Sequence, residues 1–345
     1  MSCKEHFMYR EAVEGPEAVR RTVTVCKDAV EVVAEALREA RVKRGFVVGS
    51  GTSFHASLYL QYLLNRYTDL HVTAIPASEF RAWRPTRGTY LVIGFSQSGE
   101  SSDVVEAIRE AKRLGALTIC ITNTPGSTLT RLAEYSIVTR AGEEKAVTAT
   151  KTFDVQLAAS VMITRAILGE GYGDLLSAAM AATRVVERED LLRELASKLR
   201  ETGSTFILGR GATYPVALEF ALKLKEASMI HAEGFAVREF LHGPLQLVDE
   251  STPLYVLIGS RSSYEESRVG LERIKSYKPN WVYIGPSTPK LGELFSEVVE
   301  VEDVGEDVAV LPIVKAAQLI AYYASIARGL NPDKPTKLSK VVKYS

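Results

Sequence analysis

An internal repeat constrains the fold of this chain more than any other feature of its sequence. The segment FVVGSGTSF at 46–54 resembles FILGRGATY at 206–214, and the two copies lie 160 residues apart. Each copy has the pattern of a β-strand, a Gly-x-Gly turn, small polar residues and an aromatic residue that opens a helix. A repeat of this length indicates two domains of similar topology. The chain has 345 residues, which is enough for two such domains.

Strand and helix patterns alternate after each copy of the repeat. Short β-branched runs bounded by Gly, Ser, Thr and Asn predict buried parallel strands. The predicted strands are 45–49, 71–77, 90–95, 117–122, 135–139, 206–209, 253–259, 281–285 and 298–301. The predicted helices are 16–43, 53–67, 101–114, 127–133, 151–169, 174–201, 215–230, 263–277 and 311–328. The sequence therefore predicts an α/β chain with two doubly wound parallel sheets flanked by helices.

The same pattern predicts how the chain is divided. We expect an N-terminal helical segment, a first domain with the hydroxyl-rich loop, a linking helix, a second domain and a C-terminal tail. Their predicted boundaries are 1–43, 44–170, 171–202, 203–329 and 330–345. The tail carries two prolines and four lysines, so we expect it to lie outside any core.

Charge and composition exclude several classes of function. Lys and Arg together number 42, and so do Asp and Glu, so the net charge of zero gives no general attraction to nucleic acid or to anionic membranes. The N-terminus has no secretory signal, and we expect no membrane span of about 20 apolar residues. A cytoplasmic location is therefore expected. The three cysteines and five histidines show neither disulfide nor metal-ligand spacing, so we predict no metal and no cofactor.

A hydroxyl-rich loop follows the predicted strand 90–95. Ser96, Gln97, Ser98 and Ser101 lie where this strand ends and the next helix begins. Their side chains, together with backbone N–H groups at a helix N-terminus, would form an anion-binding loop. A chain of zero net charge must hold an anionic ligand by such local contacts. The alternative is a structural helix cap with Ser98 as the N-cap residue.

The Gly-x-Gly turns of the repeat do not match a nucleotide site. A dinucleotide-binding fingerprint needs a small residue three positions after its second glycine, where this chain has Phe54 and, in the second copy, Tyr214. The sequence also has no P-loop of the GxxxxGK type. Ligands of open α/β sheets bind at strand ends, so we expect Thr52 and Ser53 to face the same pocket as the hydroxyl-rich loop.

A second small, hydroxyl-rich segment is found at 148–152. It opens the predicted helix 151–169. A ligand contact and a helix N-cap explain its composition equally well.

Three charged residues share one face of the predicted helix 215–230. Glu219, Lys223 and Glu226 are spaced at i, i+4 and i+7, which is also the spacing of ordinary exposed ion pairs. His242 follows in a Gly-Pro turn. A loop histidine near a carboxylate-bearing helix is a plausible acid–base pair at neutral pH.

These motifs together resemble one known family, the sugar isomerase (SIS) domains of glucosamine-6-phosphate synthase. The matching segments are 49–53, 77–81, 96–101, 148–153, 208–235, 241–245 and 338–342. The resemblance spans about residues 16–345 and includes both copies of the repeat. It implies two tandem SIS domains, each with a flavodoxin-like sheet.

The resemblance implies that this chain binds a hexose 6-phosphate. Val147 and Ala149 would line the sugar through backbone contacts. The residues that would hold the phosphate are Thr52, Ser53, Ser96, Gln97, Ser98 and Ser101.

It also implies four catalytic residues. Glu226 would carry a proton between carbon 1 and carbon 2, and Lys223 would support the enolamine oxygen or the charge of Glu226. His242 would open the sugar ring. Lys340 would form a Schiff base with the open sugar, which suits an amine on a C-terminal tail.

The function implied is that of a glucosamine-6-phosphate deaminase/isomerase, which yields fructose 6-phosphate and ammonia. Stand-alone pairs of SIS domains resemble archaeal-type enzymes of this kind, and we expect no glutaminase domain in this chain. The alternatives are a glutaminase-less isomerase subunit of a synthase, another phosphosugar isomerase, and a non-catalytic sugar-phosphate sensor. The family's shared site implies a homodimer in which His242 reaches the neighbouring subunit.

Overall fold

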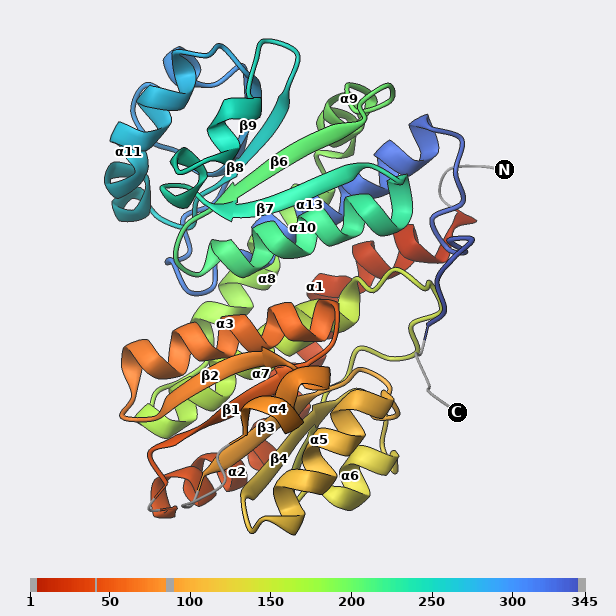
Figure 1. Cartoon of the computed structure of the whole chain (residues 1–345), viewed down its shortest axis with the longest axis vertical. Coiled ribbons are helices and arrows are strands. Elements are labelled where there is room, and N and C mark those ends of the chain that lie inside the picture. The colour runs from red at the N-terminus through yellow and green to blue at the C-terminus, as the bar shows by residue number, and fades with distance from the viewer. Residues whose placement is uncertain (1–4, 41, 85–89, 341–345) are drawn as a thin grey trace. The chain divides into compact units, whose positions relative to one another are not determined.

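The computed structural model describes residues 5–40, 42–84 and 90–340. Contacts between residues divide the chain into two compact units, each with one five-stranded parallel sheet (Figure 1). The first unit comprises Glu14–Glu144, Lys151–Leu176 and Ser339–Ser345. The second unit comprises Met1–Val13, Lys145–Thr150 and Ser177–Leu338.

The first sheet has the strand order β2–β1–β3–β4–β5, and every pair is parallel. Its strands are β1 (Arg44–Gly49), β2 (His71–Pro76), β3 (Leu91–Phe95), β4 (Leu117–Thr122) and β5 (Tyr135–Val138). This is the flavodoxin-like order of a doubly wound fold. Each predicted strand of the first half is thus present.

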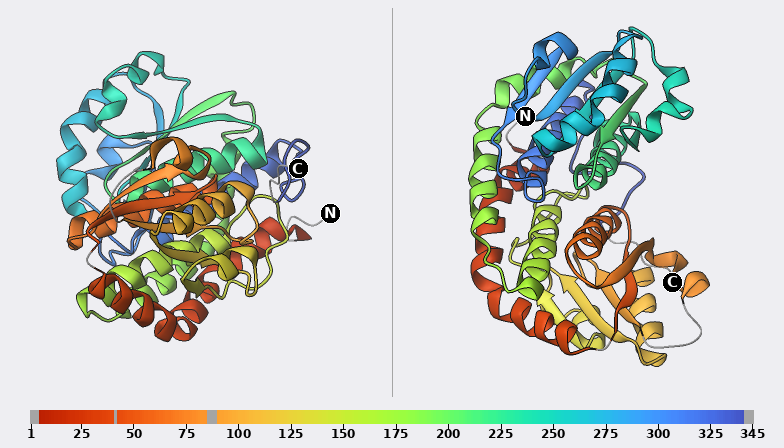
Figure 2. Two further views of the ribbon diagram at one scale, coloured as in Figure 1. Left: turned by 60° about the horizontal axis from the view of Figure 1, so that its bottom comes forward. Right: turned by 90° about the vertical axis from the view of Figure 1, so that its left-hand side faces the viewer.

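Helices cover both faces of the first sheet, as the right-hand view in Figure 2 shows. They are α2 (Lys27–Glu39), α3 (Thr52–Tyr67), α4 (Phe80–Trp83), α5 (Ser102–Arg113), α6 (Thr128–Leu132) and α7 (Lys151–Leu168), with the 3-10 turn η2 (Ala77–Glu79). The helices α2, α3 and α7 pack together, and α4, α5 and α6 form the other group. Side chains alternate between the faces of a strand, so Val48, Val92 and Cys120 point to the α5 side and share its core.

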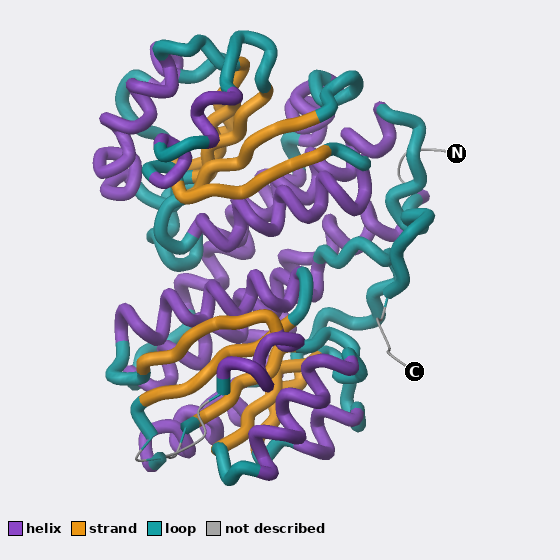
Figure 3. The backbone as a smooth tube through the Cα atoms, viewed as in Figure 1, coloured by secondary structure: helices purple, strands orange, loops and turns teal. Residues whose placement is uncertain are grey.

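The second sheet has the order β10–β9–β8–β6–β7, which is the first order read from the opposite edge. Figure 3 shows the strands of each sheet in orange. The strands are β6 (Ser204–Gly209), β7 (His231–Ala236), β8 (Pro253–Leu257), β9 (Asn280–Pro286) and β10 (Glu297–Val301). The two sheets confirm the predicted pair of doubly wound α/β folds.

The second unit has its own helical layers. Its helices are α9 (Glu189–Ser197), α10 (Thr213–Ser228), α11 (Arg261–Lys275), α12 (Leu291–Leu294) and α13 (Val310–Ala327), with the 3-10 turns η3 (Glu239–Leu241) and η4 (Pro244–Leu247). The helix α8 (Gly173–Val186) begins in the first unit and belongs to the second from Ser177 onward. By length and composition alone, α13 could cross a membrane, which the sequence reading overlooked. However, 89% of this window is buried in the protein, and α13 packs against α9 and α10, as a core helix does.

The single helix predicted at 16–43 is wrong. The chain instead forms α1 (Phe7–Val25) and α2, which meet at a bend at Cys26, where the thiol lies 3.1 Å from the Val138 carbonyl oxygen. Pro16 lies inside α1 and not at its start. A proline leaves the carbonyl four residues earlier without its helical partner. The buried Lys315 ammonium supplies that partner, because its Nζ donates to the Ala12 oxygen over 2.9 Å.

Two further predictions need correction. The helix expected at 174–201 is broken into α8 and α9, and the side chain of Glu189 at the break accepts hydrogen bonds from Tyr9 and Tyr323. Strand β7 was not predicted, because its sequence HAEGFA is neither apolar nor β-branched. Its Gly234 allows α10 to pass closely, since a Cβ there would lie 2.8 Å from the Leu218 nitrogen.

The described part of the tail is mostly exposed, as expected, but it is anchored. The carboxylate of Asp333 accepts hydrogen bonds of 2.8 Å from the backbone nitrogens of both Phe7 and Met8. A carboxylate at this position satisfies free N–H groups and complements the dipole of α1. Pro332 beside it is buried.

Candidate functional site

Each sheet reverses its strand order at one point, and this point is where open α/β sheets bind ligands. In the first unit, the order reverses between β1 and β3. We name the loops that follow these strands, 50–53 and 96–101, the first switch point. In the second unit, the order reverses between β6 and β8, and the loops 210–213 and 258–263 form the second switch point.

The Gly-x-Gly turns of the repeat have the same geometry in both units. Gly51 and Gly211 adopt φ values of 55° and 56°, where L side chains are strained. A Cβ on Gly49 would lie 2.4 Å from the Ser53 carbonyl oxygen, and a Cβ on Gly209 would lie 2.5 Å from the Thr213 carbonyl oxygen. Glycine is therefore required for the strand to pass directly into α3 and α10.

The hydroxyl-rich loop is organised by its own side chains. Ser96 Oγ accepts the Gly99 N–H over 3.1 Å and lies 3.2 Å from Ser101 Oγ. Ser98 Oγ accepts the Glu100 N–H over 3.1 Å. Gly99 has a φ of 66°, and a Cβ there would overlap Ser127 Oγ at 2.2 Å. The loop therefore folds back on itself and keeps its hydroxyl groups together.

The structural-cap alternative for Ser98 is wrong. The N-cap residue of α5 is Ser101, and its side chain makes no capping hydrogen bond. The carboxylate of Glu100 is turned away, because it accepts hydrogen bonds from the Thr128 nitrogen and hydroxyl at 2.8 and 2.9 Å. The loop thus presents hydroxyl groups at the start of a twelve-residue helix, a favourable setting for an anion.

Thr52 and Ser53 lie on the first turn of α3 at the same switch point. The Ser53 hydroxyl is buried and hydrogen-bonds the Gln156 side chain, whose Nε2 lies 3.0 Å away. Thr52 is half-buried. The structure therefore brings these two residues to the same sheet edge as the hydroxyl-rich loop, with Thr52 the more accessible of the two.

Lys340 belongs to the first unit, where it pairs with a residue that the sequence reading missed. Its Nζ lies 2.7 Å from Glu144 Oε2, and the Glu144 side chain is fully buried. The same carboxylate accepts the Thr152 hydroxyl over 2.6 Å and the Thr152 N–H over 3.1 Å. Glu144 therefore caps the first turn of α7 and fixes the tail lysine at once. It has no sequence signal, since it is one acidic residue in a polar loop.

The hydroxyl-rich loop and Glu144 face one cavity. A cavity of about 700 Å³ in the first unit is lined by Gln97 from this loop and by Glu144. Arg21, Arg140 and Asn123 also line it. Within one unit, the structure thus places Gln97 of the hydroxyl-rich loop and the carboxylate that anchors Lys340 around a common space.

The charged residues of α10 form a buried cluster. Lys223 Nζ lies 3.2 Å from Glu219 Oε1 and 2.5 Å from Glu226 Oε2. The side chains of Lys223 and Glu219 are each 1% exposed, and that of Glu226 is 20% exposed. The interpretation of these residues as exposed surface ion pairs is therefore wrong.

Electrostatics fix the protonation of Lys223. Burial disfavours its ammonium form, but the flanking carboxylates of Glu219 and Glu226 outweigh burial and raise the pKa of Lys223 above its ordinary value. Lys223 is therefore a permanent cation at neutral pH. Glu226 is the most exposed residue of the cluster, so it is the one that could exchange a proton with a ligand.

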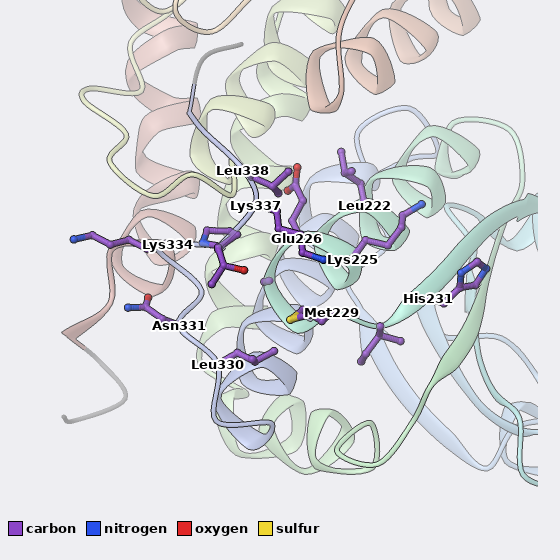
Figure 4. A pocket seen from close by; sticks show the side chains of 14 residues that line it. Leu222, Lys225, Glu226, Met229, His231, Leu330, Asn331, Lys334, Lys337 and Leu338 are labelled. Atoms are coloured by element: carbon purple, nitrogen blue, oxygen red, sulfur yellow. The ribbon is translucent and has the colours of Figure 1, made fainter.

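Glu226 opens onto a cavity of the second unit. This cavity of about 560 Å³ lies between the C-terminal end of α10 and the tail segment 330–338. Figure 4 shows the Glu226 side chain extending toward Leu338 of the tail. The rest of the lining combines apolar side chains such as Leu222 and Met229 with basic ones, and Glu226 is the acidic residue in this lining. The basic residues are Lys225, His231, Lys334 and Lys337.

The other predicted residues of the second unit are more dispersed. Val147 and Ala149 are half-buried, and the Val147 N–H donates to the Asp333 carbonyl oxygen over 3.3 Å. His242 is exposed after η3, and its ring makes no hydrogen bond to any residue that the structure describes. It is therefore available to a ligand or to another chain.

Comparison with known proteins identifies the family of this chain. The SIS domain family matches residues 37–166 and 198–284. The chain belongs to the SIS family. It is 36% and 35% identical to glutamine–fructose-6-phosphate aminotransferases (isomerizing) of Methanothermobacter thermautotrophicus and Pyrobaculum aerophilum, over 342 and 349 residues. These matches cover 98% of this chain and 57% of each relative, so the SIS chain spans somewhat more than half of their length.

A solved structure shows the same fold over nearly the whole chain. It is the C-terminal domain of glucosamine-fructose-6-phosphate aminotransferase from Francisella tularensis. The match has a TM-score of 0.86 and 26% identity, and it covers 96% of this SIS chain and 100% of the other. The two-sheet architecture is therefore that of an isolated SIS-domain pair.

Proposed function

We propose that this SIS protein is an aldose–ketose isomerase that interconverts glucosamine 6-phosphate and water with fructose 6-phosphate and ammonia. One observation carries the proposal. Lys340 is held by the buried Glu144, and Glu144 lines the same cavity as Gln97 of the hydroxyl-rich loop. An amine that pairs with the wall of this cavity suits a substrate that has both a phosphate and a carbonyl group.

The first unit would bind and hold the open sugar. The hydroxyl groups of Ser96, Ser98 and Ser101, with the start of α5, would donate hydrogen bonds to the phosphate. Lys340 would attack carbon 2 of the imine form, release ammonia and become a lysine ketimine. Water would then hydrolyse the ketimine to fructose 6-phosphate and return the free lysine.

The second unit would supply proton transfer. Glu226 would remove the proton from carbon 2 of the open amino sugar and return it to carbon 1, which converts the aldose into the ketose imine. The Lys223 ammonium, which pairs with Glu226, would hold this carboxylate in place. His242 would exchange the proton that opens the ring, since imidazole titrates near neutral pH.

The test is to incubate the purified chain with glucosamine 6-phosphate and to measure ammonia and fructose 6-phosphate together. We expect equal amounts of both, and none from Glu226→Gln or Lys340→Ala. Glucose 6-phosphate is the matched control, since it lacks only the amino group. Conversion of glucose 6-phosphate at a similar rate would contradict the amino-sugar assignment and indicate a neutral phosphosugar isomerase.

A second candidate is the isomerase part of a synthase that receives ammonia from a glutamine-hydrolysing partner. The observation that favours it is the length of the relatives, whose names include glutamine and of which this chain spans 57%. In that case, the chain would make glucosamine 6-phosphate from fructose 6-phosphate and ammonium chloride, with little reaction in the other direction. Binding without either reaction would indicate a sensor.

We further propose that the protein acts as a homodimer in which His242 serves the partner's substrate. The support is the exposure of its ring in a Gly-Pro turn. Mixing inactive His242→Ala and Glu226→Gln chains would then restore activity to about a quarter of the wild-type level, because half of the dimers contain one intact combination. If this mixture stays inactive after subunit exchange, His242 does not act on the partner's substrate.

A further inference from the structure

A carboxylate lies at the second switch point, in a position where the first switch point offers hydroxyl groups. Glu306 comes from the loop between β10 and α13. Ser263 Oγ donates to Glu306 Oε1 over 2.7 Å, and Ser260 Oγ donates to Oε2 over 3.4 Å. Ser260 is the N-cap residue of α11. The carboxylate is therefore bound at a helix N-terminus, which favours a negative charge.

The turn that follows β6 encloses the same carboxylate from the other side. A Cβ on Gly211 would lie 2.8 Å from Glu306 Oε1, and one on Gly259 would lie 3.5 Å from Glu306 Cγ. Glu306 is thus in contact with both loops of the second switch point. The loop between β10 and α13 therefore places a carboxylate between the two loops of the second switch point.

The two switch points also differ in loop length. Five residues, 96–100, separate β3 from the N-cap residue Ser101. Only Ile258 and Gly259 separate β8 from the N-cap residue Ser260. The second loop is too short to fold back as the first loop does, and the Glu306 carboxylate bonds directly to the hydroxyl groups there.

We propose that Glu306 is a built-in anion that closes the second switch point to phosphorylated ligands, so that each chain binds its sugar phosphate at the first switch point only. The inference rests on the proposed function in taking phosphate as the anion of the first switch point. The internal carboxylate satisfies Ser260 and Ser263 without a ligand. It also repels a second negative charge at close range.

The test uses inorganic phosphate as the probe and starts from the Ser98→Ala/Ser101→Ala chain, in which the first switch point is disabled. The thermal unfolding midpoint is measured with and without phosphate, at an ionic strength held constant with potassium chloride. We expect no phosphate-dependent shift in this chain. Adding Glu306→Ala should produce a rise of about 2 °C or more, because a ligand that binds only the folded state stabilises it.

Glu302→Ala is the matched control, since Glu302 lies in the same loop but pairs with Arg184 on the surface. It should give no rise. The same rise with Glu302→Ala, or no rise with Glu306→Ala, would overturn the proposal. Glu306→Ser leaves similar space and replaces the alanine variant if that variant does not fold. Failure of phosphate to stabilise the wild-type chain would contradict the proposed function instead.

Discussion

The two units share one topology but differ at the same two places. At the switch point, the first unit has a hydroxyl-rich loop in which Ser98 and Ser101 are half-buried and Ser96 is buried, whereas the second has a short loop occupied by Glu306. On the helix after the Gly-x-Gly turn, the second unit carries Glu219, Lys223 and Glu226. The positions 160 residues earlier on α3 are Tyr59, Leu63 and Arg66.

This difference lies in the side chains that the repeated fold carries at equivalent positions. The core positions Tyr59 and Leu63 are 0% and 3% exposed and pack as ordinary apolar residues. The equivalent Glu219 and Lys223 are just as buried, and ion pairing within the cluster with Glu226 makes this burial tolerable. Under the proposed function, the first unit would be the binding half and the second unit the proton-transfer half.

The largest effect is expected for Glu226→Gln, which should lower kcat by about 10²–10⁴-fold because a general base is lost. The matched change in the first unit is Arg66→Gln, at the corresponding position of α3. Arg66 is exposed, so kcat should not change. Steady-state ammonia release measures both. An equal loss of kcat in the two variants would contradict the proposal that proton transfer belongs to the second unit.

Lys223→Met should destabilise the protein by about 3–5 kcal/mol, since it leaves the Glu219 and Glu226 carboxylates without their buried partner. Leu63→Met, at the corresponding position, should cost less than about 1.5 kcal/mol because it conserves volume. Urea unfolding followed by circular dichroism measures the difference. Adding Glu219→Gln to Lys223→Met should recover part of the loss, and no recovery would argue against charge as the cause.

Ser98→Ala/Ser101→Ala should weaken binding of fructose 6-phosphate by about 10-fold or more, because hydrogen bonds to a charged group are removed. Ser260→Ala/Ser263→Ala removes two hydroxyl groups from the second switch point. The affinity of this double variant for fructose 6-phosphate should stay within about 2-fold of the wild-type affinity. Isothermal titration calorimetry compares the two. A similar loss in both double variants would place the phosphate elsewhere.

The smallest effect concerns the glycine that faces Glu306. Gly211→Ala should cost about 2 kcal/mol, since it adds contact with the carboxylate to the strain of a left-handed φ. Gly115 has a φ of 74° with nothing within 4 Å of its Cβ position, so Gly115→Ala should cost only about 1 kcal/mol. Urea unfolding gives both values. In the Glu306→Ala background, Gly211→Ala should cost no more than Gly115→Ala does. If Gly211→Ala still costs more there, contact with the Glu306 carboxylate is not the cause of the extra destabilisation.

Much of the site was predictable because its residues lie at strand ends and helix starts. The repeat predicted both sheets, and the strand ends predicted that Ser96, Ser98 and Thr52 lie at one sheet edge. Glu144 was not predictable, because its role depends on Lys340, a residue 196 positions away, and on Thr152 at the start of α7. No local pattern marks a carboxylate whose partners come from other segments.

The sequence by itself determined the periodic features of this protein: the duplicated strand–turn–helix, the parallel strands and the spacing of Glu219, Lys223 and Glu226 on one helix face. These follow from backbone geometry, which repeats locally. Tertiary structure alone decided which charges are buried, that Lys315 completes α1 at Pro16, and that Glu306 occupies the second switch point. Burial and pairing depend on segments brought together only when the chain packs, so they leave no signal in the local sequence.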